Sequence, residues 1–509
     1  MTSASLSAGL RPLFVLRLLS VIAVTVAAPL AARGPSGPAL TSRSVSADLP
    51  LTSAQQTAID RYVTAEMARQ RIPGLALGVY RHGQPIYLRG YGQANLEWQA
   101  PMTTDTRMQT GSLGKQFTAT ALMRLAEQGK VDVDASIRTY FPEAPASWQP
   151  IKVANLLSHT SGIGIYDTPE RTAPGGAFDY HADFTEEQLT KAIVALPLEF
   201  KVGSDWRYNN TNYVLLGILV HRLTGRFYGD YLHDEFFAPL GMRATRVISD
   251  TAVIEHRASG YEIKGGELRN QAWVSPTFNA TADGTIYTTV EDMARWDRAL
   301  TDGTLLKPGS LERMWTPFKL TSGKENSRRY GFGWWVDAIN GHRLIEHNGA
   351  WQGFTSDMAR YPGDGLTVTV FVNLDSDHAR AYSIAHVVAG LVSPALMPPL
   401  AKALPDDPKR SQSVRGFLMR AAAGQNTSAD YDKGADYKFD LLEQAELAAA
   451  LPAGWQNAPM TLIQREDSRG GVRYGYRIGP ADNTRVVSVT ITPSGGLTGY
   501  SISADPDSR

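Results

Sequence analysis

A serine and a lysine three positions apart, in Gly111-Ser112-Leu113-Gly114-Lys115, are the residues of this chain best suited to covalent chemistry. Residues three apart on a helix share a face, so the Ser112 hydroxyl and the Lys115 amine can come within hydrogen-bond reach. At the start of a helix, the positive helix end lowers the pKa of a lysine, and free backbone N–H groups can stabilise an oxyanion. The pair therefore predicts attack of Ser112 on a carbonyl carbon. A lone Ser-x-x-Lys is also expected by chance, and an N-cap serine beside a surface lysine gives the same pattern.

A tyrosine and an asparagine farther along the chain add to this prediction. Tyr208 and Asn210 alternate in Trp206-Arg207-Tyr208-Asn209-Asn210, just before an apolar run. A tyrosine near Lys115 could act as a tyrosinate base or as a proton donor, and Asn210 could hold both the lysine and a substrate amide. A turn that satisfies its own backbone through asparagine side chains is the alternative interpretation.

A third motif, His347-Asn348-Gly349-Ala350, stands at the end of an expected strand. Gly349 would let a substrate backbone approach closely, because glycine has no side chain. The Ala350 N–H could be the second oxyanion donor, and His347 would line the cleft.

In chain order, Ser-x-x-Lys, Tyr-x-Asn and His-x-Gly resemble the serine β-lactamase and penicillin-binding-protein family. The branch that they resemble is the class C β-lactamase-like one, with its esterases, D-aminopeptidases and D-Ala-D-Ala carboxypeptidases. The resemblance extends over roughly residues 55–395, with further matches at 155–162, 238–242, 288–294 and 330–334. It implies that Ser112 is acylated, that Lys115 and Tyr208 share the base role, and that Asn210, His347 and Gly349 line the substrate site. The N–H groups of Ser112 and Ala350 would form the oxyanion hole.

One residue departs from the family pattern. His347 stands where β-lactamases and most penicillin-binding enzymes of the family carry a lysine. A histidine attracts a substrate carboxylate only when it is protonated. Substrates that carry a carboxylate, penicillins included, are therefore expected to bind less well here than at a site with a lysine.

The elements that must position these motifs are predicted from periodicity and turn residues. A helix is expected over 53–71, and a hairpin over 76–80 and 85–88. Four strands are expected over 330–337, 343–347, 354–361 and 366–373, followed by a helix over 379–391. The strands from both ends of this region predict one antiparallel sheet, with the helical residues from about 112 to 310 inserted on one side. The fold class is α/β (α+β), of the β-lactamase/transpeptidase-like type, with a cleft between sheet and helical region.

The remainder of the chain divides by composition. A basic start and a short apolar run predict a signal peptide over 1–32, then a flexible leader over 33–50, so the protein is expected to be exported to the periplasm or secreted. The hydrolase domain is expected over 51–393 and a linker over 394–410. Residues 411–509 predict a small α+β domain, with helices over 411–423 and 441–451 and strands over 460–464, 472–478, 484–492 and 497–502. This domain weakly resembles cystatin- and NTF2-like domains.

Composition also excludes several functions. Fifty basic and fifty acidic residues leave no net charge that would attract nucleic acid. The chain has no cysteine, and its ten histidines show no metal-binding spacing, so neither a metal nor another cofactor is expected. No segment of the mature chain is long and apolar enough to span a membrane.

The expected partner is a small-molecule or peptide substrate. The preferred function is hydrolysis of an ester, a small amide or a D-amino-acid peptide. A β-lactamase or D-Ala-D-Ala carboxypeptidase is the alternative within enzymes. A non-catalytic protein that binds peptidoglycan or peptides on the same fold is the alternative outside them.

Overall fold

The computed structural model describes residues 50–375, 379–425, 451–468, 471–480 and 484–504. The expected signal peptide, nearly all of the leader and nearly all of the helix expected over 441–451 lie outside the described residues. Within those ranges, no helix combines the length and the apolar character needed to cross a bilayer.

A seven-stranded sheet forms the centre of the region over residues 50–393, in the order β3-β2-β1-β12-β11-β10-β9. Every neighbouring pair in it is antiparallel, and β1 from the start of the region pairs with β12 from its end, Leu75 lying opposite Val372. The predicted single antiparallel sheet is thus confirmed. The strands are β1 (Gly74–Arg81), β2 (Gln84–Asn95), β3 (Ala100–Pro101), β9 (Trp335–Ile339), β10 (His342–Trp351), β11 (Phe354–Tyr361) and β12 (Leu366–Val372).

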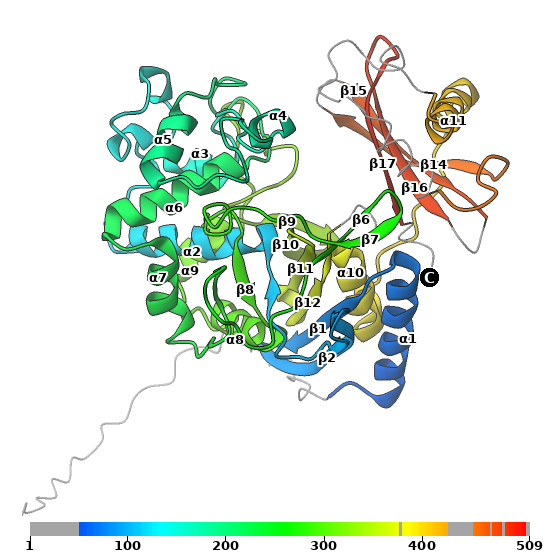
Figure 1. Ribbon diagram of the computed structural model, residues 1–509, viewed down its shortest axis with the longest axis horizontal. Helices are drawn as coiled ribbons and strands as arrows, with labels where there is room; N and C mark the ends of the chain where they lie inside the picture. The colour runs from blue at the N-terminus through cyan, green and yellow to red at the C-terminus, as the bar shows by residue number, and fades with distance from the viewer. Residues whose placement is uncertain (1–49, 376–378, 426–450, 469–470, 481–483, 505–509) are drawn as a thin grey trace, which may run out of the picture. The chain divides into compact units, whose positions relative to one another are not determined.

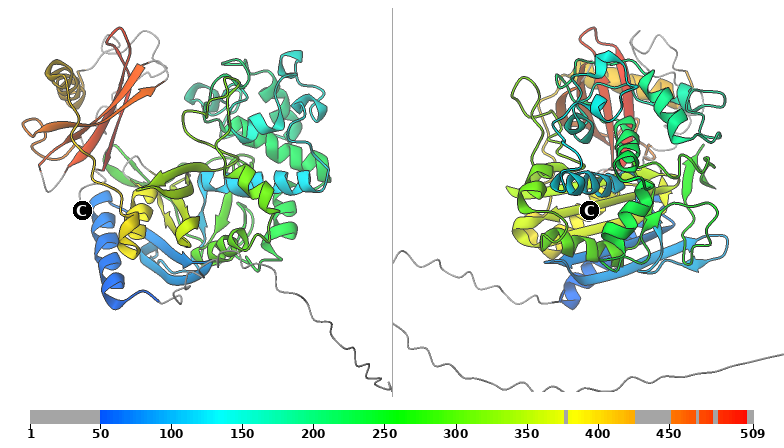
Figure 2. Two further views of the ribbon diagram at one scale, coloured as in Figure 1. Left: turned by 180° about the vertical axis from the view of Figure 1, so that it is seen from behind. Right: turned by 90° about the vertical axis from the view of Figure 1, so that its left-hand side faces the viewer.

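Helices cover both faces of this sheet (Figure 1). On one face, α1 (Ser53–Gln70) and α10 (Ala381–Val392) share a core with Leu75, Leu77 and Val79. On the other face, α2 (Lys115–Glu127) and α8 (Val290–Thr301) share a core with Ala76 and Tyr80. Because the central strands are buried on both sides, β1 is apolar at nearly every position. The view from behind again has α1 and α10 side by side (Figure 2).

The inserted helical region is built around α6 (Asn210–Thr224). Every residue of α6 from Thr211 to Val220 is buried, and a helix that is buried all round belongs to a core. The Asn209 side chain caps the helix by accepting a hydrogen bond from the Thr211 N–H at 2.8 Å. The other helices of this region are α3 (Val153–Leu157), α4 (Pro169–Thr172), α5 (Glu186–Val194), α7 (Tyr228–Leu232) and α9 (Pro308–Met314).

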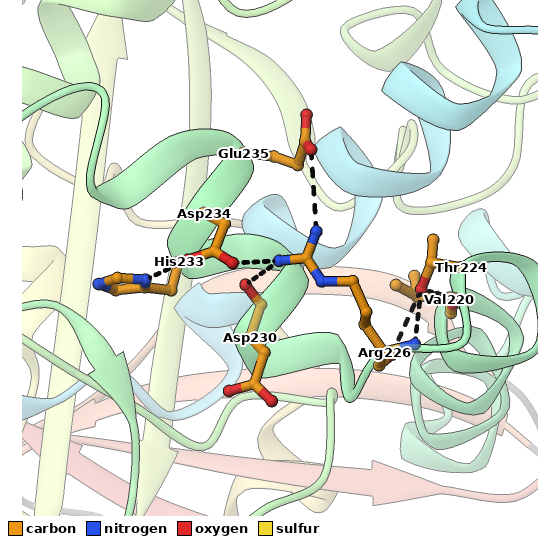
Figure 3. Close-up of polar contacts among 7 residues, drawn as sticks. All are labelled: Val220, Thr224, Arg226, Asp230, His233, Asp234 and Glu235. Carbon is orange, nitrogen blue, oxygen red and sulfur yellow. Dashed lines mark hydrogen bonds and ion pairs between the residues drawn. The ribbon is translucent and has the colours of Figure 1, made fainter.

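A polar cluster fixes the junction after α6 (Figure 3). The Arg226 guanidinium donates to the Asp230 carbonyl oxygen at 3.0 Å and pairs with the Asp234 carboxylate. The Arg226 N–H donates to the Thr224 hydroxyl at 3.2 Å. These contacts set the direction in which the chain leaves α6, whose first residue belongs to the site described below.

Two small sheets complete the region over residues 50–393. One has the order β4-β8-β5, with β4 (Met108–Gln109), β8 (Ile286–Thr288) and β5 (Arg246–Val247). The other has the order β13-β6-β7, with β13 (Leu374–Asp375), β6 (Tyr261–Lys264) and β7 (Glu267–Asn270). In the first of these sheets, β4 is followed almost directly in the chain by the turn that carries Ser112.

The C-terminal residues form a core of their own. Helix α11 (Pro408–Ala422) contributes Val414, Phe417 and Leu418, which are buried together with Tyr476 and Val487 of a four-stranded antiparallel sheet. Its strands are β14 (Met460–Ser468), β15 (Gly471–Ile478), β16 (Arg485–Ile491) and β17 (Leu497–Ala504). All four correspond to strands expected from the sequence.

Candidate active site

Ser112 lies in a tight 3₁₀ turn, Gly111–Gly114, that leads directly into α2. Its side chain is partly exposed, whereas Lys115, the first residue of α2, is fully buried. The turn is held by the Thr110 N–H, which donates to the Ile286 carbonyl of β8 at 2.8 Å. The predicted pair is therefore brought together at the start of a helix, with the serine facing solvent and the lysine beneath it.

The Lys115 ammonium has three hydrogen-bond acceptors, as many as it has protons. Its Nζ contacts Ser112 Oγ at 2.9 Å, Asn210 Oδ1 at 2.7 Å and the Asp283 carbonyl oxygen. Burial lowers the pKa of Lys115 to about 8, although the nearby carboxylates of Asp283 and Asp167 oppose this change. The sequence had suggested the positive helix end as the cause, but loss of solvent is the dominant one.

Tyr208 covers this lysine with its ring. The Lys115 Nζ lies 5.0 Å from the centre of the Tyr208 ring and 5.4 Å from that of Tyr213. Burial raises the pKa of Tyr208 well above its ordinary value, while the adjacent Ser112 side chain opposes the rise. The Tyr208 hydroxyl thus has Ser112 as a hydrogen-bonding neighbour, although the two side chains do not meet the strict geometry of a hydrogen bond. A neutral phenol next to Ser112 is suited to donating a proton.

Two glycines let β10 pack directly against the turn of Ser112. A Cβ at Gly349 would lie 2.0 Å from the Thr110 carbonyl oxygen and 2.8 Å from the Ser112 nitrogen. A Cβ at Gly111 would lie 2.5 Å from the Ala350 nitrogen. The sequence had suggested that a substrate backbone approaches Gly349. In the structure, the protein's own 3₁₀ turn fills this space instead. The close approach brings the two amides expected to form the oxyanion hole to one side of Ser112.

His347 does not line the pocket at Ser112. Its side chain has no exposed surface, and its ring lies 4.1 Å from the Trp335 ring and 6.2 Å from the Tyr208 ring. Both ring nitrogens have partners, the Tyr330 hydroxyl at 2.9 Å and the Asn348 carbonyl oxygen at 2.6 Å. Burial, and then the charge of Lys115, hold the pKa of His347 well below its ordinary range. The histidine is therefore a neutral support for the Tyr208 ring and presents no charge to a substrate.

His159 supports the same ring from within the inserted region. It is fully buried, and its ring centre lies 4.4 Å from that of Tyr208. Its backbone has a left-handed φ of 59°, which is uncommon for a residue other than glycine. The sequence motif around it had been noted only as part of a family resemblance, without a structural role.

Two carboxylates beside the lysine were missed by the sequence reasoning. The Asn210 amide nitrogen donates to the Asp167 carboxylate at 2.7 Å, and the Tyr166 hydroxyl donates to the Asp283 carboxylate at 3.1 Å. Asp167 follows a tyrosine in a loop and Asp283 precedes a glycine, and both patterns are typical of ordinary turns. No local signal distinguishes them from the other aspartates of the chain.

An open pocket lies over Ser112. It is lined by Gly111, Ser112, Asn210, Phe278, Asp283, Gly284, Thr285, Ala350 and Trp351. Ser112, Asn210 and Ala350 are three of the predicted site residues, so the residues expected to supply the nucleophile, the substrate-binding amide and the second oxyanion donor share one pocket.

Among the described residues, one group of side chains has the spacing of metal ligands. Ligand atoms of Glu346, Asp357 and His386 lie within 4.8 Å of one another, between β10, β11 and α10. None of the three lines the pocket at Ser112. The group is therefore separate from the pocket at Ser112.

Comparison with known proteins agrees with this geometry. The sequence model of the Beta-lactamase family matches residues 59–393. Penicillin-binding protein 4* of Bacillus subtilis (strain 168) is 28% identical over 312 residues, which are 58% of this chain and 67% of that protein. The chain spans about two thirds of the length of the curated relatives that it matches.

Solved structures show the same fold. The D-amino acid amidase from Ochrobactrum anthropi SV3, complexed with L-phenylalanine amide, is 27% identical with a TM-score of 0.57. That match covers 68% of this chain and 98% of the amidase. The octameric penicillin-binding protein homologue from Pyrococcus abyssi is 21% identical with a TM-score of 0.59, and the match covers 88% of this chain and 95% of the homologue.

Proposed function

Because the chain belongs to the Beta-lactamase family over residues 59–393, we propose that it is a serine hydrolase that works through an acyl-enzyme on Ser112. Its substrates are esters, small amides or D-amino-acid peptides. The observation that carries the proposal is the contact of Lys115 Nζ with Ser112 Oγ at 2.9 Å, beneath an open pocket. A buried lysine with a pKa of about 8 is a practical base near neutral pH.

The proposed reaction proceeds in two halves. Neutral Lys115 accepts the Ser112 proton as Oγ attacks the carbonyl carbon, and the Ser112 and Ala350 N–H groups stabilise the oxyanion. When the tetrahedral intermediate collapses, the bond to the leaving group breaks, and the Tyr208 hydroxyl gives that group a proton. Tyr208 is reprotonated by the Lys115 ammonium. In the second half, neutral Lys115 accepts a proton from the water that attacks the ester carbonyl, and it returns that proton to Ser112 Oγ as the ester bond breaks, which releases the acid.

The amidase among the structural relatives supports a small amide as substrate, since its match covers nearly all of that chain at 27% identity. The neutral, fully buried His347 supports the same preference, because this position offers no cation to a substrate carboxylate. Penicillins and other carboxylate-bearing lactams are accordingly expected to be poor substrates.

The proposal is tested by replacing the nucleophile. Ser112→Ala is expected to lower turnover of a p-nitrophenyl ester by about 10³-fold or more, since no acyl-enzyme can form. A fluorophosphonate probe should label the unaltered protein once, on Ser112, as read by peptide mass spectrometry. A label on another residue, or full activity of the variant, would exclude the assignment.

We also propose that the protein is exported to the periplasm or secreted, on the basic start and apolar run of residues 1–32. Expression of the full chain with cell fractionation and N-terminal sequencing tests this. A protein that is found in the cytoplasm with its first 32 residues intact would refute it.

A further inference from the structure

A buried carboxylate without a partner lies on the face of the central sheet that α10 covers. Asp357 of β11 has no exposed surface, and neither of its side-chain oxygens forms a hydrogen bond within the described part of the chain. A carboxylate taken out of water is costly unless a donor or a cation accompanies it. The retention of this acid therefore indicates a partner other than the side chains described here.

The strand register places a second carboxylate beside Asp357. In the pairing of β10 with β11, Asn348 lies opposite Asp357 and Glu346 lies opposite Ala359. Residues two apart on a strand share a face, so Glu346 and Asp357 are diagonal neighbours on one face of the sheet. Ala359 belongs to the core that includes α10, so both acids face that helix. Two carboxylates held this close repel each other unless a positive charge lies between them.

Helix α10 supplies a third group. His386 Nε2 lies 2.6 Å from the Glu346 carboxylate, and one ligand atom from each of His386, Glu346 and Asp357 lies within 4.8 Å of the other two. Zinc bonds of about 2.1 Å at tetrahedral angles put ligand atoms about 3.4 Å apart, which is within that limit. The side chains of His386 and Glu346 are 17% and 19% exposed, so an ion can enter from solvent on their side.

From this cluster we propose that Glu346, Asp357 and His386 bind one divalent transition-metal ion, for which Zn²⁺ is the best fit. Zinc takes both carboxylate oxygen and imidazole nitrogen, whereas Ca²⁺ and Mg²⁺ prefer oxygen alone. The two positive charges of the ion match the two carboxylates. The inference goes beyond the proposed hydrolysis and does not depend on it, because none of the three residues lines the pocket at Ser112.

The proposed ion is structural. It joins two neighbouring strands to the helix that packs on them, and no step of the proposed reaction passes through it. Glu346 directly precedes His347, whose ring lies 6.2 Å from the Tyr208 ring, so an ion at Glu346 also holds β10 in place behind the pocket. Histidine spacing in the sequence predicted no metal, since only one of the three proposed ligands is a histidine.

The test measures metal binding by the whole protein, purified without a histidine tag. After removal of metal with EDTA and dialysis, titration calorimetry with Zn²⁺ should show one ion per chain. At Zn²⁺ about 100-fold above the Kd, the Tm of the main transition should rise by about 5 °C, because the ion binds the folded state. Mg²⁺ and Ca²⁺ at the same concentration should leave the Tm unchanged, and an equal rise with either ion would refute the transition-metal assignment.

Two variants remove ligands one at a time. Asp357→Asn keeps the shape of the side chain and removes its charge, and His386→Ala removes the nitrogen ligand. Each should weaken Zn²⁺ binding by about 10²-fold or more, since loss of a direct ligand costs more than loss of an outer-shell partner. His221→Ala is the matched control and should bind Zn²⁺ as the unaltered protein does. His221 Nδ1 lies 2.7 Å from the Glu186 carboxylate, but among the described residues no third ligand joins this pair.

A proton shared between the two carboxyl groups is the competing occupant. In that case the stripped protein does not respond to Zn²⁺, or responds equally in both ligand variants, and either result refutes the site. Should Asp357→Asn not fold, as judged by circular dichroism, His386→Ala decides alone, and undiminished binding there refutes the site equally. Ser112→Ala should bind Zn²⁺ with unaltered affinity, so failure of the proposed function and failure of the metal site are measured separately.

Discussion

At the scale of single residues, the protonation state of Lys115 governs the proposed chemistry. Burial lowers the pKa of Lys115 to about 8, and in the proposed mechanism the base is the deprotonated amine. The rate of Ser112 labelling by a neutral fluorophosphonate should therefore rise with pH and reach half of its plateau near pH 8. Burial and the charge of Lys115 hold the pKa values of His347 and His159 well below the ordinary value, so neither should add an inflection near pH 6.5. A rate that falls above pH 8 would mean that the ammonium form is the active one.

The role of Tyr208 is predicted by the same reasoning. Because burial keeps its pKa well above the ordinary value, Tyr208 is a phenol throughout this pH range and acts as a proton donor. Tyr208→Phe should then lower kcat for a p-nitroanilide by about 10²-fold and leave the midpoint near pH 8 in place. Lys115→Ala should remove the inflection altogether. If Tyr208→Phe removed it instead, a tyrosinate base would be the better description.

At the scale of elements, the contact between β10 and the 3₁₀ turn determines the geometry of the oxyanion site. A Cβ at Gly349 would lie 2.0 Å from a backbone oxygen of that turn, and backbone cannot move aside as a flexible side chain can. Gly349→Ala should cost about 1–3 kcal/mol of stability and lower kcat by about 10²-fold, since the Ala350 amide is displaced from Ser112. Gly363→Ala is the control, because nothing lies within 4 Å of its added Cβ. Thermal melting and ester turnover measure the two effects, and equal behaviour of both variants would contradict the packing argument.

The sheet itself was predictable at this scale, except at one strand. The strand expected over 330–337 begins only at Trp335, since the Gly331 N–H donates to the Trp334 carbonyl at 2.8 Å and closes a turn there. Apolar alternation does not distinguish such a turn from an extended strand when both are buried. The hydroxyl of Tyr330, at the start of the turn, instead donates a hydrogen bond to His347 Nε2.

At the scale of the whole molecule, the C-terminal sheet and α11 have a hydrophobic core that shares no residue with the two cores around the central sheet. Val487 is fully buried in this third core. Val487→Asp should melt the C-terminal unit separately in calorimetry, because it buries an unpaired charge, and should change ester turnover by less than about threefold. Val487→Ile is the control, because it keeps the side chain apolar and should leave the C-terminal transition in place. Loss of turnover together with the C-terminal transition would show that the hydrolase region depends on this unit.

The sequence by itself determined the family and the assembly of one antiparallel sheet from the two ends of residues 50–393, and it singled out Ser112, Lys115 and Tyr208, on which the proposed mechanism rests. These predictions follow from the spacing of the motif residues and the alternation of apolar residues. Both are properties of the sequence and stay the same in any packing that buries the apolar faces. Only the tertiary structure decided that burial and not the helix end lowers the pKa of Lys115, and that His347 supports Tyr208 behind the pocket. It alone brought Asp167 and Asp283 from separate loops to the same lysine. Burial and charge proximity depend on how remote segments pack, and that information is not contained in the residues on either side of each aspartate.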